Sequence, residues 1–185
     1  MTGILKVDTI QRNDGSTPTA ADLGLNIGGN ILQVLQSQDT YTTTYSGSAF
    51  QDMTNLSVTI TPRNANSKFL LKAHLSICIN NQNYSAAFRF TRNGTPVGVG
   101  DQVGSNRPRA SFMTAQIGGG DHVLTVSQEY VDSPSTTSAI TYKVQGFAES
   151  GDTFITNRAY NASSDVNNAK HAVATCNLIV MEIAA

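Results

Sequence analysis

The amino-acid sequence predicts an all-β protein, an antiparallel β-sandwich or jelly roll with a short extended N-terminal arm. Only 14% of the 185 residues are charged, whereas a typical soluble domain is about one quarter charged. Roughly a third of the chain is Ser, Thr, Asn or Gln, residue types that suit strands and turns better than helices. From Ile31 onward the apolar residues recur with a period of two, which is typical of strands.

The first 30 residues are predicted to form the arm, and residues 31–185 the head. We expect a short strand over residues 4–10, a turn over residues 13–16, and a loop or single helical turn over residues 17–25, ended by two glycines. The arm has too few apolar residues to bury a core of its own, so it must pack on the head, on sister chains or on another protein. The candidate attachment residues are Leu5, Val7, Ile10, Leu23, Leu25 and Ile27.

The clearest strand of the head covers residues 69–79. Its alternation predicts one buried face, formed by Phe69, Leu71, Ala73, Leu75, Ile77 and Ile79. Earlier strands are expected at residues 31–36, 40–45 and 56–61, the last of which is stopped by Pro62.

A tight hairpin follows, because Asn93-Gly94 supplies two residues that accept a positive φ between alternating segments at 84–90 and 96–99. Further strands are expected at residues 109–117, 122–131, 139–148, 153–156 and 172–183. Eight to ten strands with short polar turns, and no segment with a helical period, favour a sandwich or jelly roll. The order of the strands is left open.

Charge and hydropathy exclude several classes of protein. Twelve basic and thirteen acidic residues give a net charge of −1, so we expect neither nucleic acid nor an anionic membrane as a partner. No apolar run approaches the roughly 20 residues of a membrane-spanning helix. Residues 1–9 show no basic-then-apolar leader, so we expect synthesis in a cytoplasm without a signal peptide.

Residues able to carry catalysis or hold a metal are scattered. The chain has no short Cys or His spacing of the kind that zinc sites use, and its glycine run at 118–120 leads into a strand rather than a phosphate-binding helix. The sequence therefore predicts no enzyme, no metal and no cofactor. Cys78 and Cys176 are expected to be small buried hydrophobes, with a disulfide between them as the alternative.

Arg107 and Arg109 form the one local concentration of positive charge, near Arg89 and Arg92 in the sequence. Because arginine binds carboxylates in a bidentate manner, the two residues are candidate contacts for a receptor, either an acidic glycan or a protein. The alternative is that they are exposed loop arginines without a ligand. The neutral surface rich in Tyr, Asn, Thr and Ser is also of the kind that binds sugars weakly.

Residues 3–11, followed by residues 13–17, resemble a segment of virion appendage proteins of tailed phages, particularly marine and cyanobacterial ones. The body is similar as well, in Arg92-Asn93-Gly94-Thr95 on a hairpin, in Asp132-Ser133-Pro134 before the segment 139–145, and in the closing Met181-Glu182-Ile183. The resemblance implies a jelly-roll head that assembles as a homotrimer on the virion, with the N-terminal part bound to tail or capsid proteins.

The leading hypothesis is therefore a virion protein that forms a short trimeric tail fibre or receptor-binding appendage. The chain has no repetitive shaft, which argues against a long fibre. A capsid decoration protein, in which the arm lies across capsid subunits, is the direct alternative. A free trimeric carbohydrate-binding module is a further alternative, and a glycan-degrading enzyme is the least favoured.

Overall fold

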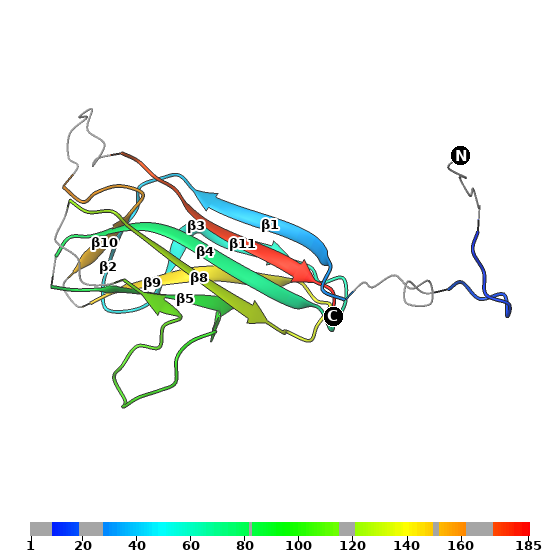
Figure 1. Ribbon diagram of the computed structural model, residues 1–185. Coiled ribbons are helices and arrows are strands. Elements are labelled where there is room, and N and C mark those ends of the chain that lie inside the picture. Colours follow the sequence, from blue (N-terminus) through cyan, green and yellow to red (C-terminus); the bar gives the residue numbers. More distant parts are fainter. Residues whose placement is uncertain (1–8, 19–27, 82, 115–120, 150–151, 162–171) are drawn as a thin grey trace.

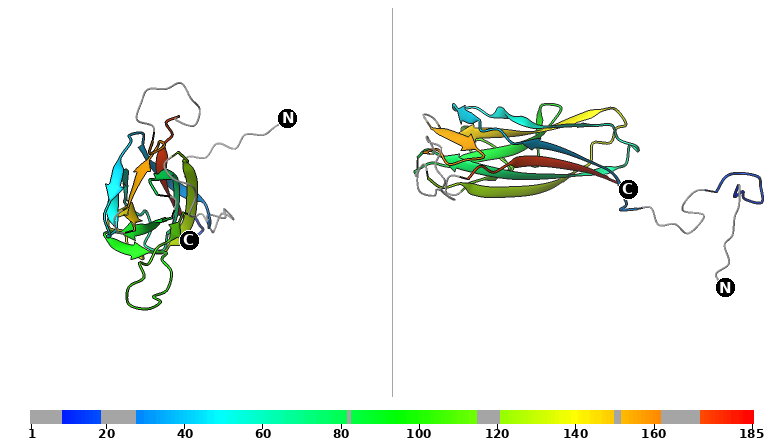
Figure 2. Two further views of the ribbon diagram at one scale, coloured as in Figure 1. Left: turned by 90° about the vertical axis from the view of Figure 1, so that its left-hand side faces the viewer. Right: turned by 90° about the horizontal axis from the view of Figure 1, so that it is seen from above.

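The computed structural model describes residues 9–18, 28–81, 83–114, 121–149, 152–161 and 172–185. Over these ranges the chain contains strands, turns and loops but no helix, and it forms two antiparallel sheets (Figure 1). The end-on view in Figure 2 shows the two curved sheets facing each other. The prediction of an all-β sandwich is confirmed.

Sheet A contains six strands, and β4 lies at its centre. In spatial order the main strands are β1 (Ile31–Asp39), β11 (Cys176–Ile183), β4 (Lys68–Ile79) and β8 (Leu124–Asp132). Beyond the end of β11, the same edge of β4 pairs with β10 (Thr153–Thr156), which in turn pairs with β2 (Thr44–Ser46).

Sheet B contains five strands and provides the opposite layer. Its order begins with β3 (Gln51–Ile60), β9 (Ile140–Ala148) and β5 (Ala86–Arg92). The far edge of β5 is shared by β6 (Thr95–Val97) and the short β7 (Phe112–Met113).

The strands pair as if one long hairpin had been folded around the core. Its tip is the turn at Asn93-Gly94, where both residues have a positive φ, as predicted. Moving away from the tip, β5 pairs with β6, β4 with β8, β3 with β9, and β1 with β11, all antiparallel. These four pairs fall alternately in sheet B and sheet A, so the chain crosses repeatedly between the layers. The short pair of β2 with β10, which lies between the last two in this nesting, is also in sheet A.

The core lies between the two inner faces. All six predicted inward residues of β4 are buried, from Phe69 to Ile79. Sheet B covers them with buried side chains that include Val58, Phe88, Phe90, Tyr142 and Val144. Phe154 of β10 joins the layers, because its ring stacks on Tyr45 at 4.8 Å between centroids and meets the edge of Phe88 at 5.4 Å.

Several predicted strands are wrong in extent. β3 begins at Gln51 rather than at residue 56, and β11 begins at Cys176 rather than at residue 172. Two further strands are shorter than predicted. Instead of the strand expected over residues 40–45, the chain turns before β2, because Asp39 accepts a hydrogen bond from the N–H of Tyr41 and Asn157 binds the carbonyl of Tyr41. The strand expected over residues 109–117 is reduced to β7 within the described part. Its predicted first residues belong to a loop instead, since Gly100 N–H donates to the carbonyl of Ala110.

The predicted turn in the arm is confirmed, with Gly15 N–H donating to the carbonyl of Arg12 and Gly15 at a φ of 82°. The strand expected over residues 4–10 lies mostly outside the described residues; its last two residues, Thr9 and Ile10, are not in a strand. The expected loop or helical turn over residues 17–25 also lies largely outside them.

Replacing Gly146 with Ala is expected to destabilise the fold. A Cβ on this residue of β9 would lie 2.4 Å from Cζ of Phe154, inside the packed core. Overpacking of this kind costs about 1–3 kcal/mol in the free energy of unfolding, measured by urea denaturation. Gly100→Ala is the matched control, because its nearest atom would be 4.0 Å away. Equal stability of the two variants would contradict the packing described here.

Candidate functional site

A hollow of about 420 Å³ lies on the outer face of sheet B. Its floor is one row of register partners, in which Ala87 of β5 pairs with Phe147 of β9 on one side and with Met113 of β7 on the other. Because a methyl group stands between two large side chains, the row is concave. Met113 is 62% exposed, so its side chain is open to anything that enters the hollow.

The rim of the hollow is mostly polar and comes from four loops. Among the described residues, Ser48, Ser85, Asn106, Pro108 and Glu149 complete its lining. Asn106 and Pro108 belong to the loop over residues 98–111, which protrudes beside β5 (Figure 1). The rim therefore places hydroxyl, amide and carboxylate groups around an apolar floor.

The 98–111 loop is braced by its own side chains. Nε of Arg109 donates to the carbonyl of Gly100 over 2.7 Å. The side-chain amide of Gln102 donates to the carbonyls of Gly104 and Arg107. The two candidate receptor residues, Arg107 and Arg109, are exposed and flank the loop residue Pro108 of the hollow. At least one guanidinium N–H of Arg109 therefore stabilises the loop that carries the rim.

The neighbouring row of the same face is charged and internally paired. Asp52 accepts hydrogen bonds from Nζ of Lys143 at 2.6 Å and from the amide of Gln145 at 2.7 Å. These bonds hold the pKa of Asp52 below its usual value, the contact with Lys143 being the larger cause. Arg89 donates to Gln145, and its guanidinium lies 3.9 Å from the centre of the Phe50 ring. The two cations of this row are thus engaged.

The outer face of sheet A carries a row of apolar side chains that no described segment covers fully. The register places Val34, Met181, Leu70 and Val131 side by side across β1, β11, β4 and β8. We call these four residues the apolar row. Val34 and Val131 are 52% and 50% exposed. Ile31 and Ile183, register partners at the end of the sheet, extend the same apolar surface.

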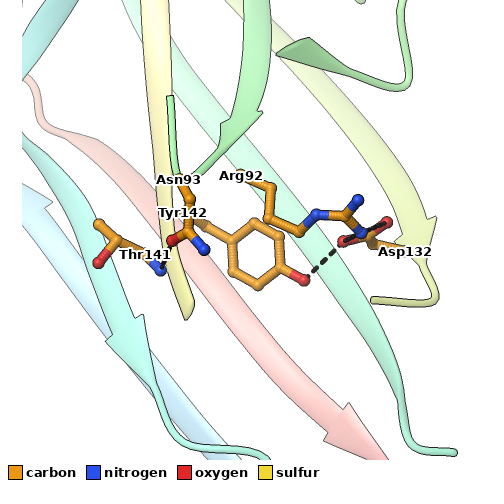
Figure 3. Close-up of polar contacts among 5 residues, drawn as sticks. All are labelled: Arg92, Asn93, Asp132, Thr141 and Tyr142. Atoms are coloured by element: carbon orange, nitrogen blue, oxygen red, sulfur yellow. Dashed lines mark hydrogen bonds and ion pairs between the residues drawn. The ribbon is translucent and has the colours of Figure 1, made fainter. Parts of the chain in front are cut away.

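A polar cluster, buried at Asp132 and Tyr142, joins the hairpin tip to β8 and β9 (Figure 3). Arg92 forms an ion pair with Asp132 at 3.0 Å, and the hydroxyl of Tyr142 donates to the same carboxylate at 2.7 Å. Burial, followed by the bond to Asp132, raises the pKa of Tyr142, so the phenol stays protonated. Asn93 adds a bond from the N–H of Thr141 to its side-chain oxygen. The groups of this cluster bind one another, which indicates a structural role.

A second buried carboxylate lies in the same row of sheet A. Glu182 and Asp132 are the register partners of Phe69 on its two sides. Glu182 accepts hydrogen bonds from the amide of Gln33 at 2.5 Å and from the N–H of Arg63 at 2.7 Å. Burial alone would raise the pKa of Glu182, but the hydrogen bonds outweigh it and lower the pKa. Glu182 thus binds β1 and the loop after β3 to β11.

The predicted attachment residues Leu5, Val7, Leu23, Leu25 and Ile27 lie outside the described residues. Ile10 is described and is 49% exposed. Cys78 and Cys176 are both buried, as the favoured interpretation held. Burial raises the pKa of both thiols, that of Cys176 to about 11. The sequence does not predict the hollow, because the pairing of β5 with β7 leaves no periodic signal.

No family model and no curated protein matches the chain. Within the described ranges, no three His, Cys, Asp or Glu side chains are grouped so that they could hold a metal ion. A helix long and apolar enough to cross a membrane is likewise not found among the described residues. The geometry of the two outer faces is therefore the basis for a functional proposal.

The Glu182→Gln variant is expected to lose about 1.5–3 kcal/mol of stability at neutral pH, the usual contribution of hydrogen bonds to a charged group. Because the folded pKa lies below the ordinary value of 4.5, the wild-type chain gains this stability above pH 4.5 and loses it as the pH falls through the folded pKa.

Urea denaturation at pH 7 and at pH 3.5 measures the difference. The difference in the free energy of unfolding between wild type and the Glu182→Gln variant should shrink at the lower pH. The Asp101→Asn variant, changed in the exposed loop, should have the free energy of unfolding of the wild type at both pH values. A gap that grows on acidification would contradict the assignment.

Proposed function

We propose that this chain is a structural protein of a tailed-phage virion, a short trimeric tail fibre or receptor-binding appendage held by its N-terminal arm. The proposal includes a non-enzymatic role, with copies of itself and other virion proteins as partners. The observation that carries it is the apolar row on the outer face of sheet A, together with the point at which the arm enters the sandwich.

The head of this appendage is proposed to be a jelly roll. In that fold, eight strands form two four-stranded sheets with Greek-key connections. The nested pairs support it, since β1, β11, β4 and β8 form one layer and β3, β9, β5 and β6 the other. On this proposal β2, β7 and β10 are short additions at the edges.

The apolar row supports self-association. Exposed apolar side chains that adjoin across four strands mark an interaction surface more often than isolated ones do. The next row along the sheet places Ile179 between Gln36 and Lys72. Lys72 forms an ion pair with Glu129 at 2.7 Å. A closed assembly in which three copies turn this face toward a common axis would bury the apolar row and leave the paired charges at its border.

The position of the arm fits such an assembly. The N–H of Gly29 donates to the carbonyl of Ala184, and the N–H of Ala184 donates to the carbonyl of Asn30. The arm therefore joins the sandwich beside the C-terminal end of β11, at the end marked C in Figure 1. Ile31, Ile183 and the apolar row lie near this end, so the arms of associated copies would leave together toward a tail or capsid surface.

The Met181→Glu variant tests the self-association. Wild-type chain is expected to have the mass of three chains by size-exclusion chromatography with light scattering. A carboxylate placed between Val34 and Leu70 would be buried unpaired in the assembly, so the dissociation constant should rise by a factor of ten or more.

Met113→Glu is the matched control, because it makes the same change on the outer face of the other sheet. Circular dichroism should show both variants folded. A wild-type chain with the mass of one chain, or equal dissociation of the two variants, would contradict the proposal.

Deletion of residues 1–30 tests the arm. The remaining chain begins at the first residue of β1, so it should keep the β-type circular dichroism spectrum and a melting temperature close to that of the full chain. It should fail to join phage particles during assembly, whereas the full chain, expressed in parallel, should copurify with them. Truncated protein that remains on the particles would refute attachment through the arm.

A further inference from the structure

We infer that the hollow on the outer face of sheet B is a binding site for an uncharged saccharide ring. The role of this site as the receptor contact of an appendage rests on the proposed function. Its binding chemistry follows from the residues of the hollow alone. The sheet that carries it faces away from the apolar row, so the site would stay open in an assembly through sheet A.

The shape of the hollow suits a small ring. Its volume of about 420 Å³ falls in the range of about 300–1,000 Å³ that small-molecule sites usually have. Phe147 and Met113 form apolar walls on either side of Ala87. A pyranose has an apolar C–H face that packs on an aromatic ring, and the ring of Phe147 is held by Phe50 at 5.5 Å between centroids.

The rim suits a ligand that both donates and accepts hydrogen bonds. Ser48 and Ser85 supply hydroxyls, which do either, and Asn106 supplies an amide with both a donor and an acceptor. Glu149 supplies an acceptor. Sugar hydroxyls match this mixed set at every position, whereas an apolar side chain of a peptide would leave these groups without partners.

The charges of the hollow favour an uncharged sugar over an acidic one. Glu149 is the ionisable group among the described lining residues. Lys143 is paired with Asp52, and Arg89 is held over Phe50 and bound to Gln145. A carboxylate on the ligand would meet Glu149, and none of the described lining residues is a cation that could offset the repulsion. This selectivity distinguishes the hollow from the acidic-glycan site predicted for Arg107 and Arg109.

Methyl NMR of the full chain labelled at methionine tests the inference directly. The chain has four methionines, and three report on separate places: Met113 in the hollow, Met53 in the core and Met181 in the apolar row. Glucose and N-acetylglucosamine are the uncharged probes, and glucuronate is the charged one. An uncharged sugar should shift the Met113 signal saturably and leave those of Met53 and Met181 in place, with glucuronate at least about tenfold weaker.

Two variants separate binding from folding. Ala87→Leu fills the hollow from its floor and should abolish the shift of Met113, while Ala185→Leu adds the same side chain at the exposed C-terminus and should not. Should Ala87→Leu fail to fold, Phe147→Leu removes the aromatic wall and should weaken binding about tenfold.

No shift of Met113 with either uncharged sugar would overturn the inference, as would equal binding of glucuronate. A shift produced by a short apolar peptide in place of the sugars would overturn it too. The oligomeric mass and the Met181 signal are measured on the same sample, so loss of self-association is recognised separately from loss of sugar binding.

Discussion

Strand β4 is the element on which the rest of the fold depends, because it pairs along both edges and fills the centre of the core. Its inward residues from Phe69 to Ile79 are all buried, and each large apolar side chain so buried stabilises the fold by about 1.5–3 kcal/mol. β11 and β10 pair with one edge of β4 and β8 with the other. Sheet B is held in place largely because its apolar face has to cover this strand.

The buried charges lie where the layers must be fixed to each other. Asp132 and Glu182 flank Phe69, and each carboxylate binds groups that belong to other segments: Arg92 and Tyr142 for Asp132, Gln33 and Arg63 for Glu182. Breaking a buried polar contact leaves an unpaired group and is costly. These two carboxylates therefore specify how the layers meet, and the outer faces stay available for partners.

Local signals were sufficient for the elements that depend on neighbours in sequence. The alternation of residues 69–79 predicted β4 and its buried face, Asn93-Gly94 predicted the hairpin tip, and the two cysteines were expected to be buried. The pairing order could not be predicted, because all of the nested pairs except β5 with β6 join residues far apart in the chain. The extent of β7 was not predicted for a related reason. Its two residues form a strand only because they pair with β5.

The candidate binding surfaces could likewise not be predicted from the sequence alone. Arg107 and Arg109 were predicted from their closeness in sequence, and they flank a residue of the hollow. The floor residues Ala87, Phe147 and Met113 come together only through the pairing of three strands. The apolar row likewise takes one residue from each of four strands, none of them unusual in its own segment. Surfaces built across strands are set by register, and register follows from the whole fold.

Cryo-electron microscopy of the phage particles in which we propose that this chain assembles is the most direct test. We expect a three-fold appendage on the particle, with the arms directed into a tail structure. The outer faces of sheet A should turn toward the three-fold axis, and the hollows of sheet B should turn outward. Density on the capsid instead would replace the tail role with decoration. Particles that lack the chain, or copies that meet through sheet B, would contradict the account.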